Sequence, residues 1–152
     1  MSTSSTPLAN EGRANRMIEE KYDQLGPLLG AVGELAADEI GGDPNGIYLY
    51  VEVGDRWISV NLFRDEGDVI RYYSHDDELS ELIWQAWEAE SLDSKKRWAV
   101  MEYEIRDGKF DAQFIYPDQV DVESYDVDRR AIALRKRFGD KPIIYPPMPN
   151  LD

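Results

Sequence analysis

Few side chains in this 152-residue chain are suited to catalysis. His75 is the only histidine and cysteine is absent, which excludes thiol catalysis and cysteine-ligated zinc or iron–sulfur sites. His75 precedes Asp76 and Asp77 in a pattern typical of a helix start, which favours a capping or surface role over catalysis. No serine lies in a G-x-S-x-G motif, and no glycine-rich phosphate-binding motif occurs. We therefore predict that the protein is not an enzyme and binds no cofactor; a small hydrolase using carboxylates or His75 is the alternative.

Carboxylates are the most abundant functional groups, with 31 Asp and Glu against 17 Lys and Arg. At this density adjacent carboxylates are expected by chance, so they are weak evidence for glycosidase-type acid/base chemistry. The acidic segments 65–68 and 76–78 do not follow the calcium-loop pattern, and turn or helix-cap roles explain both. We predict no metal site.

The formal net charge of −14 belongs to the middle of the chain. Residues 22–94 contain three arginines and 17 carboxylates, whereas the segments on either side are each neutral. An acidic surface repels nucleic acid, so direct binding of DNA or RNA is not expected. Such a surface either keeps a protein solvated or attracts a basic protein partner, and the charge count leaves both interpretations open.

One tryptophan within this acidic region is a candidate anchor for a partner. The helix expected after His75 has an apolar face made of Leu79, Leu82, Ile83, Ala86 and Trp87. Trp84 falls on the opposite side, close to Asp77, Glu81 and Glu88. Carboxylates at the expected sheet turns extend this patch, namely Asp55, Asp65, Glu66 and Asp68. Either Trp84 anchors a partner, or it packs under the N-terminal segment or the C-terminal tail.

The spacing of apolar residues predicts an α+β fold with the element order α-βββ-α-ββ-α. Helical spacing extends from residue 17 to 40, with an interruption at Gly26-Pro27. Alternation over 47–53, 57–64 and 69–73 predicts an antiparallel meander, with Gly54-Asp55 as its first turn. The segments 98–105 and 110–116 flank Asp107-Gly108, the signature of a type I′ hairpin. A last helix begins near Asp126 and ends at Gly139. The helices should pack on an antiparallel sheet of about five strands.

We expect one domain over residues 13–146. Residues 1–12 are predicted to be a disordered lead-in, and residues 147–152 an extended, proline-rich tail. The segment from Lys141 to Tyr145 should run extended across the surface. No apolar run approaches the roughly 20 residues of a membrane span, and the N-terminus lacks a signal-peptide pattern, so a cytoplasmic protein is expected.

Several segments together resemble the YezG-like immunity-protein family. They are the run from Ile47 to Val53, the strand ending in Tyr72-Tyr-Ser-His-Asp76, the acidic tryptophan-bearing helix, the hairpin over 98–116, and the stretch from Arg129 to Tyr145. The similarity covers roughly residues 14–146, and its most specific pieces are Tyr73-Ser-His-Asp76 and the order of elements.

Members of that family are small cytoplasmic α+β proteins regarded as antitoxins to the C-terminal toxic domains of bacterial polymorphic toxins, often nucleases. The resemblance therefore implies a non-enzymatic inhibitor of a cognate toxin domain, without a cofactor. It assigns no individual binding residue. An acidic cytosolic chaperone or adaptor for a secreted effector could use the same aromatic and acidic surface, and is the alternative function.

Overall fold

The computed structural model describes residues 26–54, 56–90, 97–121 and 123–146. The predicted lead-in, the proline-rich tail, the first part of the predicted N-terminal helix and Asp55 lie outside the described residues.

Two long strands form the centre of the sheet. Strand β1 (Ile47–Gly54) pairs antiparallel with β2 (Trp57–Asp65), in a register that places Gly54 opposite Trp57. Gly54, which the sequence predicted to be part of the turn, is therefore the last paired residue of β1. A side chain at Gly54 would overlap the indole of Trp57, which lies across this position.

Four further strands complete the sheet. They are β3 (Ile70–Tyr73), β4 (Val100–Arg106), β5 (Lys109–Ile115) and β6 (Ile143–Ile144). The strand order is β5-β4-β1-β2-β3-β6, and every neighbouring pair is antiparallel except β3 and β6.

The sixth strand is one more than predicted. It arises where the extended segment after Lys141 pairs with β3, and the amide of Ile70 donates to the carbonyl of Pro142 at 2.9 Å. A strand of two residues is too short to show a period of two in the sequence.

Two predicted glycine positions are confirmed. Asp107 and Gly108, between β4 and β5, have φ angles of 53° and 76°, as a type I′ turn requires. Gly139 has a φ angle of 68° and follows α3 (Asp126–Phe138), and its amide donates to the carbonyl of Arg135 at 2.8 Å. A single turn of 3-10 helix, Pro117–Gln119, connects β5 to the segment before α3.

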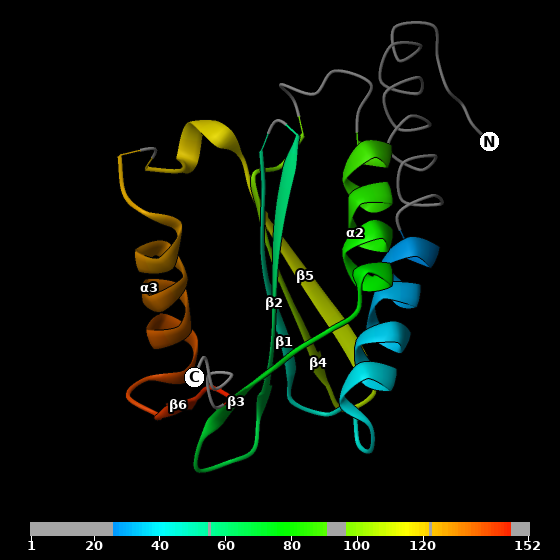
Figure 1. The fold of residues 1–152 in the computed structure, drawn as a ribbon, viewed down its shortest axis with the longest axis vertical. Coiled ribbons are helices and arrows are strands. Elements are labelled where there is room, and N and C mark those ends of the chain that lie inside the picture. The colour runs from blue at the N-terminus through cyan, green and yellow to red at the C-terminus, as the bar shows by residue number, and fades with distance from the viewer. Residues whose placement is uncertain (1–25, 55, 91–96, 122, 147–152) are drawn as a thin grey trace, which may run out of the picture.

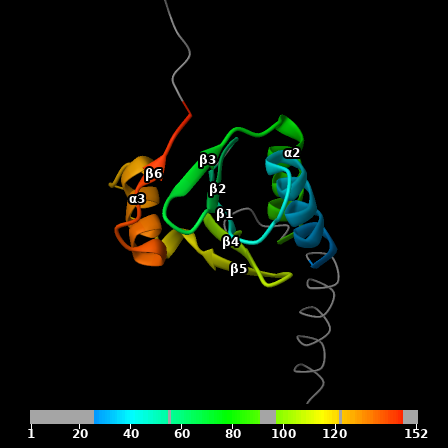
Figure 2. The same ribbon diagram turned by 90° about the horizontal axis from the view of Figure 1, so that it is seen from below.

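Helices cover both faces of the sheet (Figures 1 and 2). A helix over residues 26–40 and α2 (Asp77–Glu90) lie side by side on one face, and α3 lies on the other. Both faces are therefore buried, and the two sets of alternating residues on β1 contribute to two cores. Ile47, Leu49, Val51 and Val53 pack towards α2, whereas Tyr48 and Tyr50 pack towards α3. The structure has the predicted α+β class, and no described helix is long and apolar enough to span a membrane.

Candidate protein-binding site

Helix α2 is held on the sheet by an apolar stripe. Its buried side chains are Leu79, Ile83, Ala86 and Trp87. They recur every three or four residues, which places them on one face of the helix. The indole Nε1 of Trp87 also donates to the carbonyl of Trp98 at 2.8 Å, which ties α2 to the segment before β4. The opposite side of α2 is therefore left facing solvent.

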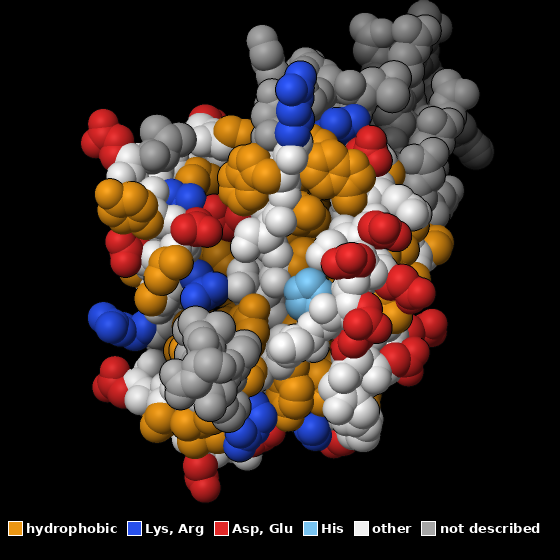
Figure 3. Space-filling model, viewed as in Figure 1, with side chains coloured by type: hydrophobic (Ala, Val, Ile, Leu, Met, Phe, Trp, Pro, Cys, Tyr) orange, Lys and Arg blue, Asp and Glu red, His pale blue; other side chains and the backbone are white. Residues whose placement is uncertain are grey.

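The solvent side of α2 carries carboxylates without cationic partners. Asp77, Glu78, Glu81 and Glu88 are exposed, and none forms an ion pair with a described residue. The chain from Asp76 to Glu90 holds six carboxylates and no Lys or Arg. In Figure 3, acidic side chains gather along this side of the molecule. The predicted residues Asp77, Glu81 and Glu88 therefore share one acidic surface, which we call the α2 acidic surface.

Trp84 lies at the border of this surface and is half-buried. Its ring centroid is 4.9 Å from that of Trp87, because residues three positions apart are neighbours on a helix. Trp84 also lines a hollow of about 350 Å³ together with Glu81 and Ile58 of β2. The indole is thus neither fully exposed nor fully in the core. Its predicted alternative, packing under the N-terminal segment or the C-terminal tail, concerns segments that include residues 1–25 and 147–152, outside those described.

The acidic residues of the turn between β2 and β3 do not join the α2 acidic surface. This turn projects from the end of the sheet, away from α2, in both ribbon views (Figures 1 and 2). Asp65 accepts hydrogen bonds from Arg106 at 2.7 Å and from Lys141 at 3.0 Å. Burial opposes ionisation of Asp65, but these bonds and one from the amide of Gly67 outweigh it and lower its pKa to about 2.

Glu66 has its negative charge paired with a cation in the same turn. It accepts hydrogen bonds from the Tyr73 hydroxyl at 2.9 Å and from Arg71 at 3.0 Å, and these two contacts lower its pKa. Asp68 is exposed and forms no ion pair with a described residue, but it lies on the same turn and not beside α2. Asp65 and Glu66 therefore stabilise the turn instead of extending the surface around Trp84.

Carboxylates beneath α3 are also paired. Arg129 binds Glu52 at 2.7 Å, and Arg137 binds Glu104 at 2.8 Å and Glu102 at 3.5 Å. Arg129, near the start of α3, and Arg137, near its end, thus neutralise the charge of carboxylates on β1 and β4. Helix α2 has no Lys or Arg of its own, and its exposed carboxylates have no ion-pair partner among the described residues.

The outer edge of β2 is a feature beside the α2 acidic surface that the sequence analysis missed. Strand β3 pairs only with Leu62–Asp65, so the Trp57–Asn61 part of β2 has no described strand on that side. The imidazole Nε2 of His75 lies 3.0 Å from the carbonyl oxygen of Val60 at this edge. The signal was present in the unequal lengths of the predicted strands 57–64 and 69–73.

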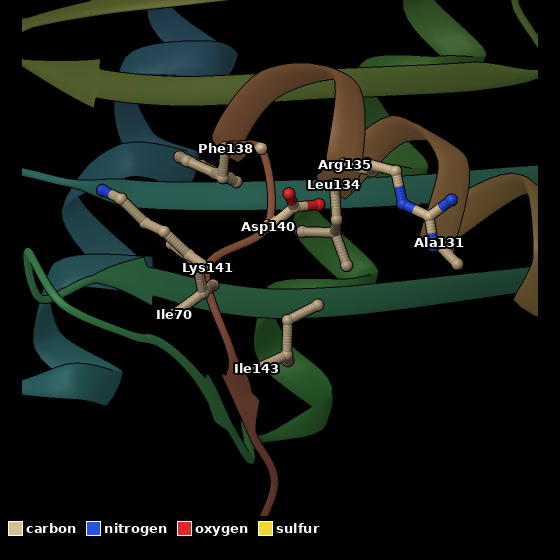
Figure 4. Close-up of a pocket in the computed structure, with 9 residues that line it drawn as sticks. Ile70, Ala131, Leu134, Arg135, Phe138, Asp140, Lys141 and Ile143 are labelled. Atoms are coloured by element: carbon tan, nitrogen blue, oxygen red, sulfur yellow. The ribbon is translucent and has the colours of Figure 1, made fainter.

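A second hollow lies beneath the end of α3 (Figure 4). It measures about 220 Å³, and Ile70, Leu134 and Ile143 lie around its centre. The charged ends of Arg135 and Lys141 point in opposite directions and away from these side chains, and the Lys141 ammonium binds Asp65. Asp140 lies beside Leu134 in the same hollow, so its lining is both polar and apolar.

The described residues contain no group of three or more His, Cys, Asp or Glu side chains placed to hold a metal ion. The chain matches no protein-family model and no curated protein.

Proposed function

We propose that this protein is an immunity protein that binds and neutralises a basic toxin domain in the cytoplasm through the α2 acidic surface. The observation that carries the proposal is the contrast between the two sides of the sheet. Glu52, Glu102 and Glu104 under α3, and Asp65 and Glu66 in the β2–β3 turn, are paired with arginine or lysine. Asp77, Glu81 and Glu88 have no such partner among the described residues.

This charge distribution suits the capture of a nuclease-type toxin. A nuclease holds phosphates with basic side chains, and a surface that presents carboxylates can occupy those side chains instead. Opposite charges also accelerate encounter, which favours rapid capture of a toxic partner. The resemblance to YezG-like immunity proteins supports the same conclusion, and a half-buried tryptophan beside the carboxylates provides apolar area at the contact.

The test is to purify this protein and the toxic domain encoded beside its gene, and to measure toxin activity and binding rates. A triple variant, Asp77→Lys/Glu81→Lys/Glu88→Lys, should slow association roughly tenfold or more at low salt and change dissociation less, because it removes long-range attraction. The matched control reverses three exposed acidic residues elsewhere, Asp68→Lys/Asp111→Lys/Asp118→Lys, and changes the net charge equally.

Equal slowing by the two triple variants would assign the effect to net charge and contradict a binding role for α2. The immunity function would be contradicted if the neighbouring genes encode no toxin, or if the toxin stays active in the presence of saturating amounts of this protein. If the partner protein keeps its activity when bound, and its secretion depends on this protein, the chaperone or adaptor function is indicated instead.

A further inference from the structure

The outer edge of β2 directs hydrogen-bonding groups away from the sheet. In an antiparallel ladder, successive residues point their N–H and C=O groups to alternate sides. The amide of Asp65 donates inward, to the carbonyl of Gly46 at 2.8 Å, whereas the carbonyl of Val60 meets His75 on the outer side. The same alternation places the backbone groups of Ile58 on the outer side as well.

His75 occupies the place of the next β3 residue. Tyr73 pairs with Leu62, so a continued β3 would place residue 75 opposite Val60. The chain leaves the sheet after Tyr73, and the imidazole of His75 contacts the Val60 carbonyl in place of a backbone amide. The amide of Val60 and both backbone groups of Ile58 form no hydrogen bond with any described residue.

The edge is most accessible at its start, where Trp57 is exposed and Ile58 is half-buried, whereas Val60 is buried; apolar side chains lie on both sides of it. In Figure 3, a strip of backbone and uncharged polar side chains lies between two groups of hydrophobic side chains, with the histidine at its lower end. Trp57, which is 47% exposed, belongs to the side that faces α3. Ile58 belongs to the other side and lines the hollow with Trp84 and Glu81.

The hollow has the chemistry to hold a lysine or arginine side chain. The aliphatic part of such a side chain can lie along Ile58 and the ring of Trp84, while its charge reaches the carboxylate of Glu81. An internal example lies one turn further along α2, where the Arg97 guanidinium is 4.5 Å from the ring centroid of Trp87. The row of carboxylates on α2 favours further positive charge on the same segment.

We propose that the Trp57–Asn61 edge of β2 pairs with an extended, basic segment of the partner protein, which adds a strand to the sheet. This proposal rests on the proposed function, since it specifies how the basic partner is held. Main-chain hydrogen bonds to Ile58 and Val60 provide affinity, and the hollow selects a cationic side chain at one position. A second copy of this chain is disfavoured, because pairing two β2 edges would bring two acidic α2 helices to the same face of a joint sheet.

The direct test uses short synthetic peptides and amide hydrogen exchange measured by NMR. The probe is a capped Lys-Val repeat; a Glu-Val repeat controls for charge, and a Lys-Pro repeat has the same charge but cannot form a ladder. We expect the Ile58 and Val60 amides to exchange rapidly in the free protein. Saturating Lys-Val peptide should slow their exchange at least about tenfold, whereas neither control peptide should do so.

Two variants separate strand addition from attraction by charge alone. Ile58→Pro removes an outward N–H without removing a β1 bond, and should abolish protection at Val60; an otherwise unchanged amide spectrum shows that the fold is intact. Glu81→Gln should weaken Lys-Val binding about two- to fivefold, whereas Asp68→Asn, at the β2–β3 turn, should leave it unchanged.

Several results would overturn the proposal. They are equal binding of the Lys-Pro peptide, no protection of Ile58 and Val60 by the Lys-Val peptide, and slow exchange of these amides in the free protein. Slow exchange that depends on protein concentration would assign the edge to a second copy, and slow exchange at all concentrations to residues of the same chain.

If Ile58→Pro leaves toxin binding intact while the α2 triple variant weakens it, the proposed function stands without strand addition. If the peptide pairs with the edge but no toxin is neutralised, the proposed function fails alone.

Discussion

At the scale of single residues, Glu52 is a buried carboxylate that needs partners for its charge. This carboxylate on β1 is only 3% exposed and lies beneath α3. Arg129 donates to both of its oxygens, at 2.7 and 3.0 Å, and the Tyr50 hydroxyl donates at 2.7 Å. Burial and the hydrogen bond to Glu52 together raise the pKa of Tyr50. A buried carboxylate is tolerated here because its charge and its lone pairs are satisfied.

Replacing the cation of this pair should be costly. Arg129→Met leaves a buried, unpaired charge on Glu52, and should lower the free energy of unfolding by about 3 kcal/mol. The measurement is urea denaturation at neutral pH, with Arg135→Met, an exposed arginine on the same helix, as the control. The control should change stability by no more than about 0.5 kcal/mol. Adding Glu52→Gln to Arg129→Met should recover part of the loss; an unaltered stability of Arg129→Met would show that the pair is not needed.

At the scale of elements, the helix over residues 26–40 approaches β4 through one glycine. The Tyr103 hydroxyl donates to the carbonyl of Leu29 at 2.7 Å, and a side chain at Gly33 would overlap the Tyr103 hydroxyl. Burial of this tyrosine is the largest contribution to its raised pKa. Gly33 is thus required by close packing, since glycine in a helix otherwise lowers helical stability.

Two glycine substitutions in this helix should have opposite effects. Among the described residues, no heavy atom outside the adjacent helix backbone lies within 4 Å of a Cβ built at Gly30, so Gly30→Ala should stabilise the protein by about 0.5–1 kcal/mol through helix propensity alone. Gly33→Ala should destabilise it by about 1–3 kcal/mol, because Tyr103 must move. Thermal and urea unfolding of the two variants provide the comparison. Stabilisation by both substitutions would mean that the helix does not pack on Tyr103 as described.

At the scale of the whole molecule, Asp65 connects segments that are distant in the sequence. Its partners Arg106 and Lys141 are 41 and 76 residues away, at the end of β4 and just before β6. The three side chains bind the β2–β3 turn to two other parts of the sheet. The same pairing removes this turn from the acidic surface, so the net charge is distributed unequally over the two sides of the molecule.

The depressed pKa of Asp65 predicts a loss of stability in acid. The pKa falls from 3.8 to about 2 on folding, so the contribution is complete above the unfolded value and is lost as the pH drops through the folded value. Asp65→Asn should therefore lower the free energy of unfolding by about 2 kcal/mol at neutral pH and reduce its pH dependence between about pH 4 and pH 2.

Urea denaturation at a series of pH values measures this effect, and Asp68→Asn in the same turn is the control. The control should lose as much stability in acid as the unsubstituted protein, since Asp68 is exposed and has no cationic partner among the described residues. If Asp65→Asn loses as much stability between about pH 4 and pH 2 as the unsubstituted protein does, other carboxylates cause the loss of stability.

Local features of the sequence were sufficient to determine the elements and several of their ends. The alternation of apolar residues identified the long strands, and Asp107-Gly108 and Gly139 marked a hairpin and a helix end. These properties depend on residues a few positions apart, because turn conformations and helix ends are set by the local backbone.

Only the tertiary structure decided which charges remain unbalanced, where Trp84 lies and which sheet edge is unpaired. Asp65 and Asp77 are alike in the sequence, but one is bound by Arg106 and Lys141 and the other is exposed on α2. Trp84 was expected opposite the apolar stripe, yet its ring reaches Trp87 and the hollow beside β2. Ion pairs, burial and strand neighbours join residues that are far apart along the chain, so they follow from packing and not from local spacing.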